Sequence, residues 1–216
     1  MKKLLLTAFL TVTAVAAQAD DNLIRHPLAA GGEAGEFRII AKKPEHFNRK
    51  PSECASVKFD HDKNNLYFTV LMDDNDVISE ALKDQDMLRN FGDCIQIFIK
   101  SETETFVWEF QIAPNGKKTC FFHPGPGRML YPQPNFKAPE FSVKNSFYKG
   151  KWEMTVKLPL SIFKAKGFKF TKEEKWTAVI VRYNYSRLHT EREVSSYPQT
   201  LANTANPDFY AELILK

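Results

Sequence analysis

An acidic cluster follows an apolar stretch in the first half of the chain. The stretch 66–72 runs directly into Asp73, Asp74, Asn75 and Asp76. Carboxylate and amide oxygens are the ligands that Ca²⁺ prefers in proteins. The sequence therefore predicts a structural calcium ion held by Asp73, Asp74 and Asp76, and no other cofactor.

Polar side chains that could hydrogen-bond a ligand alternate with apolar ones in two later stretches. Over 94–99, three isoleucines share one face and Gln96 lies on the other. Over 106–112, aromatic and aliphatic side chains share one face, while Glu109 and Gln111 lie opposite. Successive strand residues point to opposite faces, so one face is predicted to enter the core and the other to form either a solvated surface or a ligand platform.

Patterns that carry catalysis are missing from the sequence. There is no Gly-x-Ser-x-Gly, no phosphate-binding loop and no His-Glu-x-x-His, and the five histidines are dispersed singly. A glycosidase needs two carboxylates across a cleft, and Asp93 with Glu109 could be arranged in that way. Any acid-rich β protein would permit the same pairing, so we predict that the chain is not an enzyme.

The N-terminus has the pattern of a secretory signal peptide. Lys2 and Lys3 precede the apolar run 4–17, and Ala17-Gln18-Ala19 matches a small-x-small cleavage site. Residues 1–19 are therefore expected to be removed, leaving a secreted or periplasmic protein. No later stretch is long and apolar enough to suggest a membrane span.

Charge and cysteine usage narrow the functional classes further. The formal net charge of +4 includes Lys2 and Lys3, and the remaining lysines are scattered, so a nucleic-acid partner is not expected. The three cysteines, Cys54, Cys94 and Cys120, permit one disulfide at most. Cys94 and Cys120 could form it, or all three could be free thiols.

The remaining pattern is one of short strands separated by turns. Ten strands are expected, in the ranges 37–41, 55–59, 66–71, 93–100, 106–112, 118–122, 140–145, 151–158, 176–184 and 210–215. Trp108, Trp152 and Trp176 lie on the predicted inward faces. The ranges 77–88 and 191–208 are expected to be loops, and 20–36 a flexible N-terminal lead-in. Together they predict one all-β domain over 37–216, an antiparallel β-sandwich of immunoglobulin-like or jelly-roll-like type.

The order of these pieces resembles the family 9 carbohydrate-binding modules and the wider DOMON-like β-sandwich group. The matching pieces, in order, are LYFTVLMDDND, GDCIQIFI, FVWEFQIAPNG, WEMTVKLPLSIF, WTAVIVRYNYS and EVSSYPQTLANTANPDFYAELIL. They span about residues 57–215. The resemblance implies an exported, non-catalytic module that binds a poly- or oligosaccharide, acts in polysaccharide breakdown beside a glycan-degrading enzyme, and uses calcium structurally.

The resemblance also implies where a sugar would bind. Gln96 and Gln111 stand at positions that are polar in the family, opposite the aliphatic core. Asn90-Phe91 and the range 201–206 stand where the family has stacking tryptophans, so Phe91, Tyr131, Tyr185 or Tyr197 would take over stacking. The predicted carbohydrate-binding residues are Gln96, Glu109, Gln111, Arg182, Asn184, Tyr185 and Tyr197.

Two alternatives remain open from the sequence. One is a protein-interaction module of the same fold without a sugar site. The other follows from DOMON-like relatives that hold haem b between Met and His, for which Met72 with His123 or His189 would serve. Arg182 is in phase with the inward residues of its strand, so a buried structural role competes with sugar binding there.

Overall fold

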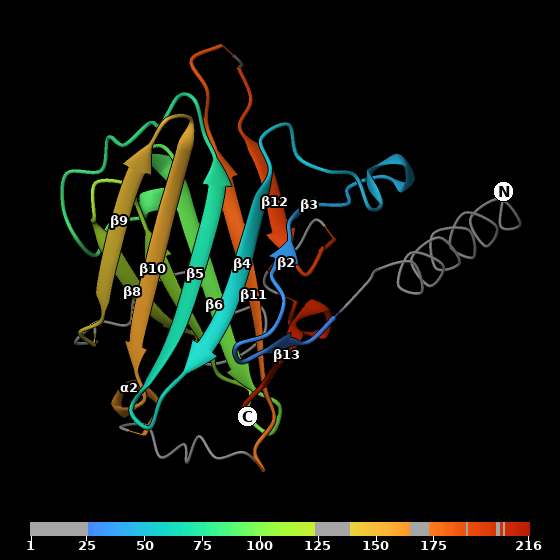
Figure 1. Ribbon diagram of the computed structural model, residues 1–216, viewed down its shortest axis with the longest axis vertical. Helices are drawn as coiled ribbons and strands as arrows, with labels where there is room; N and C mark the ends of the chain where they lie inside the picture. Colours follow the sequence, from blue (N-terminus) through green and yellow to red (C-terminus); the bar gives the residue numbers. More distant parts are fainter. Residues whose placement is uncertain (1–25, 124–138, 165–172, 189, 202–203, 205) are drawn as a thin grey trace, which may run out of the picture.

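The computed structural model describes residues 26–123, 139–164, 173–188, 190–201, 204 and 206–216. Two β-sheets pack face to face, with β9, β10, β5 and β4 in one layer and β8, β6 and β11 in the other (Figure 1). The predicted β-sandwich is confirmed. The predicted signal peptide lies outside the described residues.

The smaller sheet has five antiparallel strands in the order β2-β4-β5-β10-β9. Their bounds are β2 Gly35–Glu36, β4 Ala55–His61, β5 Asn65–Asp73, β10 Lys151–Pro159 and β9 Ser142–Tyr148. The strict in-out burial of β5 and β10 shows one face on the core and one in solvent, as alternating apolar residues predict.

The larger sheet has eight strands. Its main path is β1-β13-β11-β6-β7-β8, and β12 pairs with both β11 and β3. The bounds are β1 Leu28–Ala29, β3 Arg38–Ile39, β6 Cys94–Ser101, β7 Val107–Ile112, β8 Lys118–His123, β11 Trp176–Asn184, β12 Glu193–Tyr197 and β13 Ala211–Ile214. All neighbours are antiparallel except β1 and β13, which run parallel.

Helical turns in the described part of the chain are short. They are η1 Pro44–His46, η2 Leu88–Asn90, α2 Ser161–Lys164 and η3 Pro207–Phe209. Within the described residues, none of the helices has the length and apolarity needed to cross a bilayer.

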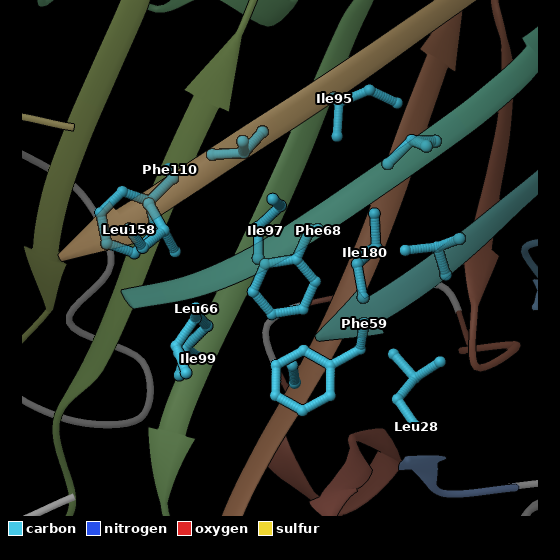
Figure 2. Close-up of a cluster of buried hydrophobic side chains, with 14 of the residues drawn as sticks. Leu28, Phe59, Leu66, Phe68, Ile95, Ile97, Ile99, Phe110, Leu158 and Ile180 are labelled. Carbon is cyan, nitrogen blue, oxygen red and sulfur yellow. The ribbon is translucent and has the colours of Figure 1, made fainter. Parts of the chain in front are cut away.

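The main core fills the space between the sheets (Figure 2). Ile95, Ile97 and Ile99 of β6 face Phe59 and Phe68 of the smaller sheet, and all five are nearly or fully inaccessible to solvent. Burying each such side chain contributes roughly 1.5–3 kcal/mol. The three tryptophans predicted to face inward, Trp108, Trp152 and Trp176, belong to this core.

The larger sheet is buried on its outer face as well. A second apolar cluster there includes Leu88, Phe98, Val181, Tyr183 and Tyr210. The unbroken burial of β7 and most of β6 and β11 follows from having packed residues on both sides of the sheet.

Two expectations for the loops are wrong. The range 191–208 contains β12, which a regular alternation of apolar residues would not reveal because its sequence is EVSSY. The supposed flexible lead-in contributes β1 and β2, and Leu28 of β1 is buried in the main core. Core packing and non-local strand pairing fix both segments.

The cysteines do not pair. Cys54, Cys94 and Cys120 are free thiols. Cys120 belongs to the main core and Cys94 to the cluster on the outer face, so the sheet separates them. Burial raises the pKa of both buried thiols and keeps them protonated.

Candidate functional site

The outer face of the larger sheet carries a polar cluster centred on the Glu109 carboxylate. The Glu109 cluster consists of Gln96, Glu109, Gln111 and His123. Gln96 Nε2 and Gln111 Nε2 donate to Glu109 Oε1 over 2.7 and 2.5 Å. His123 Nε2 lies 2.8 Å from the other carboxylate oxygen. Since Gln96 and Gln111 are direct cross-strand partners, the register itself brings these side chains together.

Several buried polar atoms at this face have no hydrogen-bond partner among the described residues. They are Gln96 Oε1, His123 Nδ1 and the Tyr210 hydroxyl. Burial, and then the nearby Glu109 charge, raise the pKa of Tyr210, which keeps its hydroxyl protonated. An unsatisfied buried polar group costs about 1–3 kcal/mol, so three at one face indicate a place suited to polar ligand atoms.

The segment between β5 and β6 packs over part of the Glu109 cluster. Arg89 N donates to Gln111 Oε1 over 3.4 Å, and Gln111 Nε2 lies 3.3 Å from Met87 Sδ. Thr119 Oγ1 donates to the Asp86 carbonyl over 2.7 Å. Gln96 and Gln111 are consequently 0% exposed and Glu109 4%. The sequence predicted an accessible platform, whereas the structure covers these side chains.

The Gly92-Asp93 step anchors this covering segment. Gly92 has φ +119°, and a Cβ there would lie 2.3 Å from the Ile78 carbonyl oxygen, so both conformation and space require glycine. The Asp93 carboxylate accepts from Ile78 N over 2.5 Å and from Tyr185 N over 2.7 Å. Burial raises the pKa of Asp93 to about 7. Asp93 thereby ties the covering segment to the chain that follows β11.

The exposed rim of the site comes from these two segments. Phe91 is 39% exposed and directly precedes Gly92. Tyr185 donates its hydroxyl to the Arg89 carbonyl over 2.8 Å. Arg192 donates to that hydroxyl over 2.8 Å and to the same carbonyl over 3.1 Å. Its guanidinium lies 4.8 Å from the Tyr183 ring centre. We call Arg89, Phe91, Tyr185 and Arg192 the rim.

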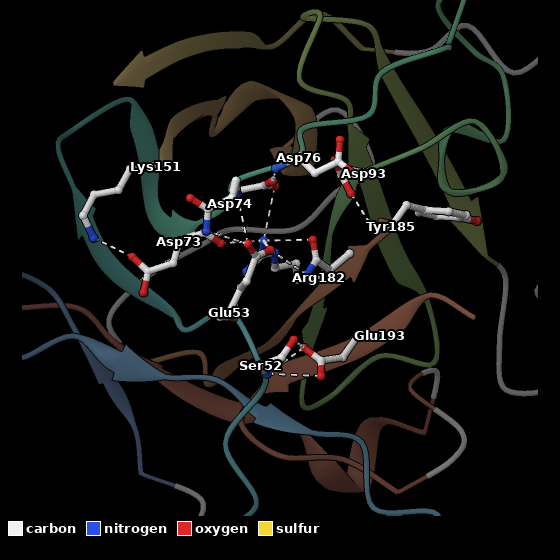
Figure 3. A network of polar contacts seen from close by, with 12 residues as sticks. Ser52, Glu53, Asp73, Asp74, Asp76, Asp93, Lys151, Arg182, Tyr185 and Glu193 are labelled. Atoms are coloured by element: carbon white, nitrogen blue, oxygen red, sulfur yellow. Dashed lines mark hydrogen bonds and ion pairs between the residues drawn. The ribbon is translucent and has the colours of Figure 1, made fainter. Parts of the chain in front are cut away.

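Arg182 belongs to a different cluster, with Glu53 and Asp74 around it (Figure 3), and Asn184 belongs to the same cluster through its hydrogen bond to Arg182. Arg182 donates to the carbonyls of Glu53 and Asp73, to Asp74 Oδ2 and to Asn184 Oδ1, all within 3.2 Å. Asn184 Nδ2 donates to Glu53 Oε2 over 3.0 Å. We call Glu53, Asp74, Arg182 and Asn184 the Arg182 cluster. It joins the segment before β4, the end of β5 and β11, and its contacts support a buried structural role for Arg182.

The predicted calcium ligands each face a different cation of the protein. Asp73 contacts Lys151 Nζ at 2.5 Å, Asp74 contacts Arg182 at 3.2 Å, and Asp76 pairs with Arg187. In the described ranges, no group of three or more His, Cys, Asp or Glu side chains is arranged to hold a metal ion. Calcium binding stays a prediction.

The remaining candidates lie apart from the Glu109 cluster. Tyr197 donates to the His26 carbonyl over 2.8 Å and lines a groove of about 640 Å³ beside β2. Met72 is packed in the main core, whereas His123 lies on the outer face of the larger sheet, so this pair does not face a common haem site. His189 and Tyr131 fall outside the described residues.

The structure thus unites Gln96, Glu109 and Gln111 and places Tyr185 at their rim. The sequence pattern predicts His123 only as a haem ligand, and it does not indicate Arg89, Arg192 or Tyr210 as site residues. Arg192 directly precedes β12, which was not foreseen, and the contacts of Arg89 cross more than 90 residues of sequence. No local signal pointed to either arginine.

The fold is that of the carbohydrate-binding modules of family 9, which confirms the resemblance at the level of the fold. A "putative carbohydrate-binding protein" from Bacteroides uniformis aligns over 93% of this chain and 90% of its own, with a TM-score of 0.63 and 14% identity. A family 9 module from Caldicellulosiruptor kristjanssonii, solved with cellotriose, aligns over 89% and 94% with a TM-score of 0.58 and 14% identity.

A structure of a family 9 module from C. kristjanssonii with glucose gives a TM-score of 0.54 at 13% identity, over 91% of this chain and 85% of that one. No protein-family model matches the sequence, and no curated protein sequence matches it. The comparisons therefore establish the fold.

Proposed function

We propose that this protein binds carbohydrate at the outer face of the larger sheet, between the Glu109 cluster and the rim. The observation that carries the proposal is the Glu109 cluster itself, with the unpartnered polar atoms of Gln96 and His123 buried beside it. Two structures of the same fold were solved with cellotriose and glucose, which supports a sugar rather than another polar ligand.

The Glu109 cluster and the rim offer a sugar two different kinds of contact, hydrogen bonds and ring stacking. Fixed amide, carboxylate and imidazole groups suit neighbouring hydroxyls, each of which both donates and accepts. At the rim, the exposed ring of Phe91 and the half-buried ring of Tyr185 can cover the C–H face of a pyranose ring with little loss of conformational entropy. Because the Glu109 cluster is covered, the rim is the part that a ligand meets first.

Export, a non-catalytic role and an enzyme partner belong to the proposal. Export rests on the signal pattern of residues 1–19. The non-catalytic role is supported by Asp93, one of the two carboxylates considered for glycosidase chemistry, which is 1% exposed and accepts from the backbone N–H groups of Ile78 and Tyr185. Glycoside hydrolysis needs two carboxylates facing the substrate, and Asp93 is engaged inside the protein. Association with a polysaccharide-degrading enzyme follows from the sequence resemblance alone.

Calorimetric titration of the mature protein with glucose, cellotriose and a wider oligosaccharide panel tests the proposal. We expect binding, and we expect Glu109→Gln to weaken it at least about tenfold, the loss of one charge-assisted hydrogen bond. Glu153→Gln is the matched control, because Glu153 is on β10, paired in register with Leu71 and Ser146, away from the larger sheet. Equal affinities for the two variants would refute this site.

Failure of every glycan to bind a folded protein would refute carbohydrate binding altogether. A specific observation then favours protein docking: Leu82 and Leu188 are 88% and 86% exposed. Leu82 lies in the segment between β5 and β6, and Leu188 in the one between β11 and β12. Exposed apolar side chains of this kind suit a protein partner.

A further inference from the structure

Two arginines of the rim, Arg89 and Arg192, form no ion pair in the described part of the chain. Among the described residues, ion pairs are formed by other cations, and neither Arg89 nor Arg192 lies within 4.0 Å of a carboxylate. In the rest of the sequence the acidic residues are Asp20 and Asp21 alone. The rim therefore presents two positive charges that no carboxylate of the described residues pairs with.

The acids of neighbouring segments are already engaged or exposed. Asp93 accepts two backbone N–H groups, and Asp76 pairs with Arg187. Glu193 accepts from Ser52. Glu191 is exposed and forms no ion pair among the described residues.

Arg192 is held in a defined position while remaining exposed. One nitrogen, Nη1, donates to the Arg89 carbonyl and to the Tyr185 hydroxyl. The guanidinium lies 4.8 Å from the Tyr183 ring centre and 5.8 Å from that of Tyr185. A guanidinium has five N–H donors, and the described residues leave those on Nε and Nη2 without a partner. Its planar fork is therefore pre-organised for an incoming oxyanion.

Arg89 connects Arg192 and Tyr185 to the Glu109 cluster. Its backbone N–H reaches Gln111 and its carbonyl holds both Tyr185 and Arg192. Burial raises the pKa of Tyr183, and the charges of Arg89 and Arg192 oppose that rise, which places both charges near one ring. Glu109 is the nearest acid that these contacts reach, through Gln111, but it forms no ion pair with either arginine. Two like charges near one ring, neither of them within 4.0 Å of a carboxylate of the described residues, are stabilised by an anion.

We propose that the glycan bound at this site carries an anionic group, a uronate carboxylate or a sulfate ester, and that Arg192 binds this group with the support of Arg89. This inference rests on the proposed function. Arg192 supplies the paired donors that match the oxyanion, and Arg89 adds charge beside it. Phe91 and Tyr185 then cover the sugar ring next to the anionic substituent.

The test compares pairs of ligands that share the same sugar and differ in whether they carry an anionic group. The mature protein is titrated with trigalacturonic acid and with its methyl ester, which keeps the sugars and removes the charges. Glucose 6-sulfate against glucose forms the second arm and separates sulfate from carboxylate recognition. We expect at least one anionic ligand to bind about tenfold more tightly than its neutral match, and added salt to reduce the difference.

Variants separate a charge-binding role from a structural one. Arg192→Gln should abolish the preference for the anion, and Arg89→Gln should reduce it. Arg187→Gln is the control, since Arg187 is an exposed cation of the same segment that is paired with Asp76. A merely structural role of Arg192 would weaken neutral and anionic ligands equally and leave their ratio unchanged, which would overturn the inference, as would an equal effect of Arg187→Gln on the ratio.

The ligand pairs also separate a failure of the anion inference from a failure of the proposed carbohydrate binding. If the methyl ester and glucose bind as tightly as their anionic matches, the anion inference is wrong and carbohydrate binding stands. If neither the charged nor the neutral ligands bind a protein with an intact fold, both are wrong.

Discussion

The Arg182 cluster and the Glu109 cluster are both buried polar groups, yet they differ in how completely they are paired. In the Arg182 cluster four acceptors surround one guanidinium, and among the described residues Nε is the one buried side-chain nitrogen or oxygen of the cluster that lacks a hydrogen-bond partner. Around the Glu109 cluster, an amide oxygen, an imidazole nitrogen and a tyrosine hydroxyl all lack partners in the described structure. One cluster has used its hydrogen-bonding capacity inside the protein, and the other has capacity left.

The difference in pairing suggests that one cluster stabilises the fold and that the other binds a ligand. A paired buried network links elements and is costly to break, because each partner left behind is an uncompensated charge. A partly unpaired network lowers stability and is retained where a ligand can complete it. We therefore assign Arg182 and Asn184 to the fold, and the contrast supports the proposed binding site at the Glu109 cluster.

The largest effect should come from Arg182→Met. The substitution keeps an apolar side chain of similar length but leaves the Asp74 carboxylate, itself 0% exposed in its side chain, without its cation. We expect the free energy of unfolding to fall by about 3–5 kcal/mol, the usual result of removing one partner of a buried ion pair. Urea denaturation followed by circular dichroism measures it.

Lys151→Ala provides the matched control for that measurement. Lys151 pairs with Asp73, the neighbour of Asp74, but both side chains are about two-fifths exposed. Exposed pairs contribute up to about 1 kcal/mol. If the two substitutions destabilise the protein equally, the Arg182 cluster is not the structural link that its contacts indicate.

A smaller effect is expected for the pH dependence of stability. Burial raises the pKa of Asp93 to about 7, from an ordinary value near 3.9. Between these values the folded protein retains a proton that the unfolded chain has released, so the free energy of unfolding falls as pH rises from about 4 to about 7 and then levels off. The pKa of Asp74 is also raised by burial and acts in the same direction.

Asp93→Asn removes the titrating group while keeping its shape. We expect the slope between pH 4 and 7 to become shallower by up to about 1.4 kcal/mol per pH unit. Denaturation curves at four or more pH values measure this for wild type and variant. Parallel slopes would show that Asp93 does not titrate in this range.

The fold was largely predictable because its signals are local. Alternating residues in β5, β6 and β7 fixed which side faces the core, and Pro114-Asn115-Gly116 marked the turn between β7 and β8. The same alternation placed Arg182 in phase with the inward residues of β11, where the structure has it. Period-two patterns report one strand at a time, and these strands carry them clearly.

The site was predictable only in part because its cover and its rim are non-local. Alternation correctly put Gln96 and Glu109 opposite the core, but it could not show that the segment before Gly92 packs over them. That segment has no regular period, and its contacts to Gln111 and Thr119 depend on the folded sheet. The position of Arg192 in the rim depends on β12, which begins at the next residue and whose sequence EVSSY lacks an apolar repeat.

The smallest change in stability should accompany Gln96→Leu. This substitution tests most directly whether the Glu109 cluster differs from the Arg182 cluster in serving binding rather than stability. Leucine removes the unpartnered Oε1, which offsets the loss of the hydrogen bond to Glu109. We expect the free energy of unfolding to change by less than about 1 kcal/mol while glycan affinity falls about tenfold. Paired denaturation and calorimetric titration measure both. A large destabilisation with unchanged affinity would place the Glu109 cluster beside the Arg182 cluster, as a part of the fold rather than of the binding site.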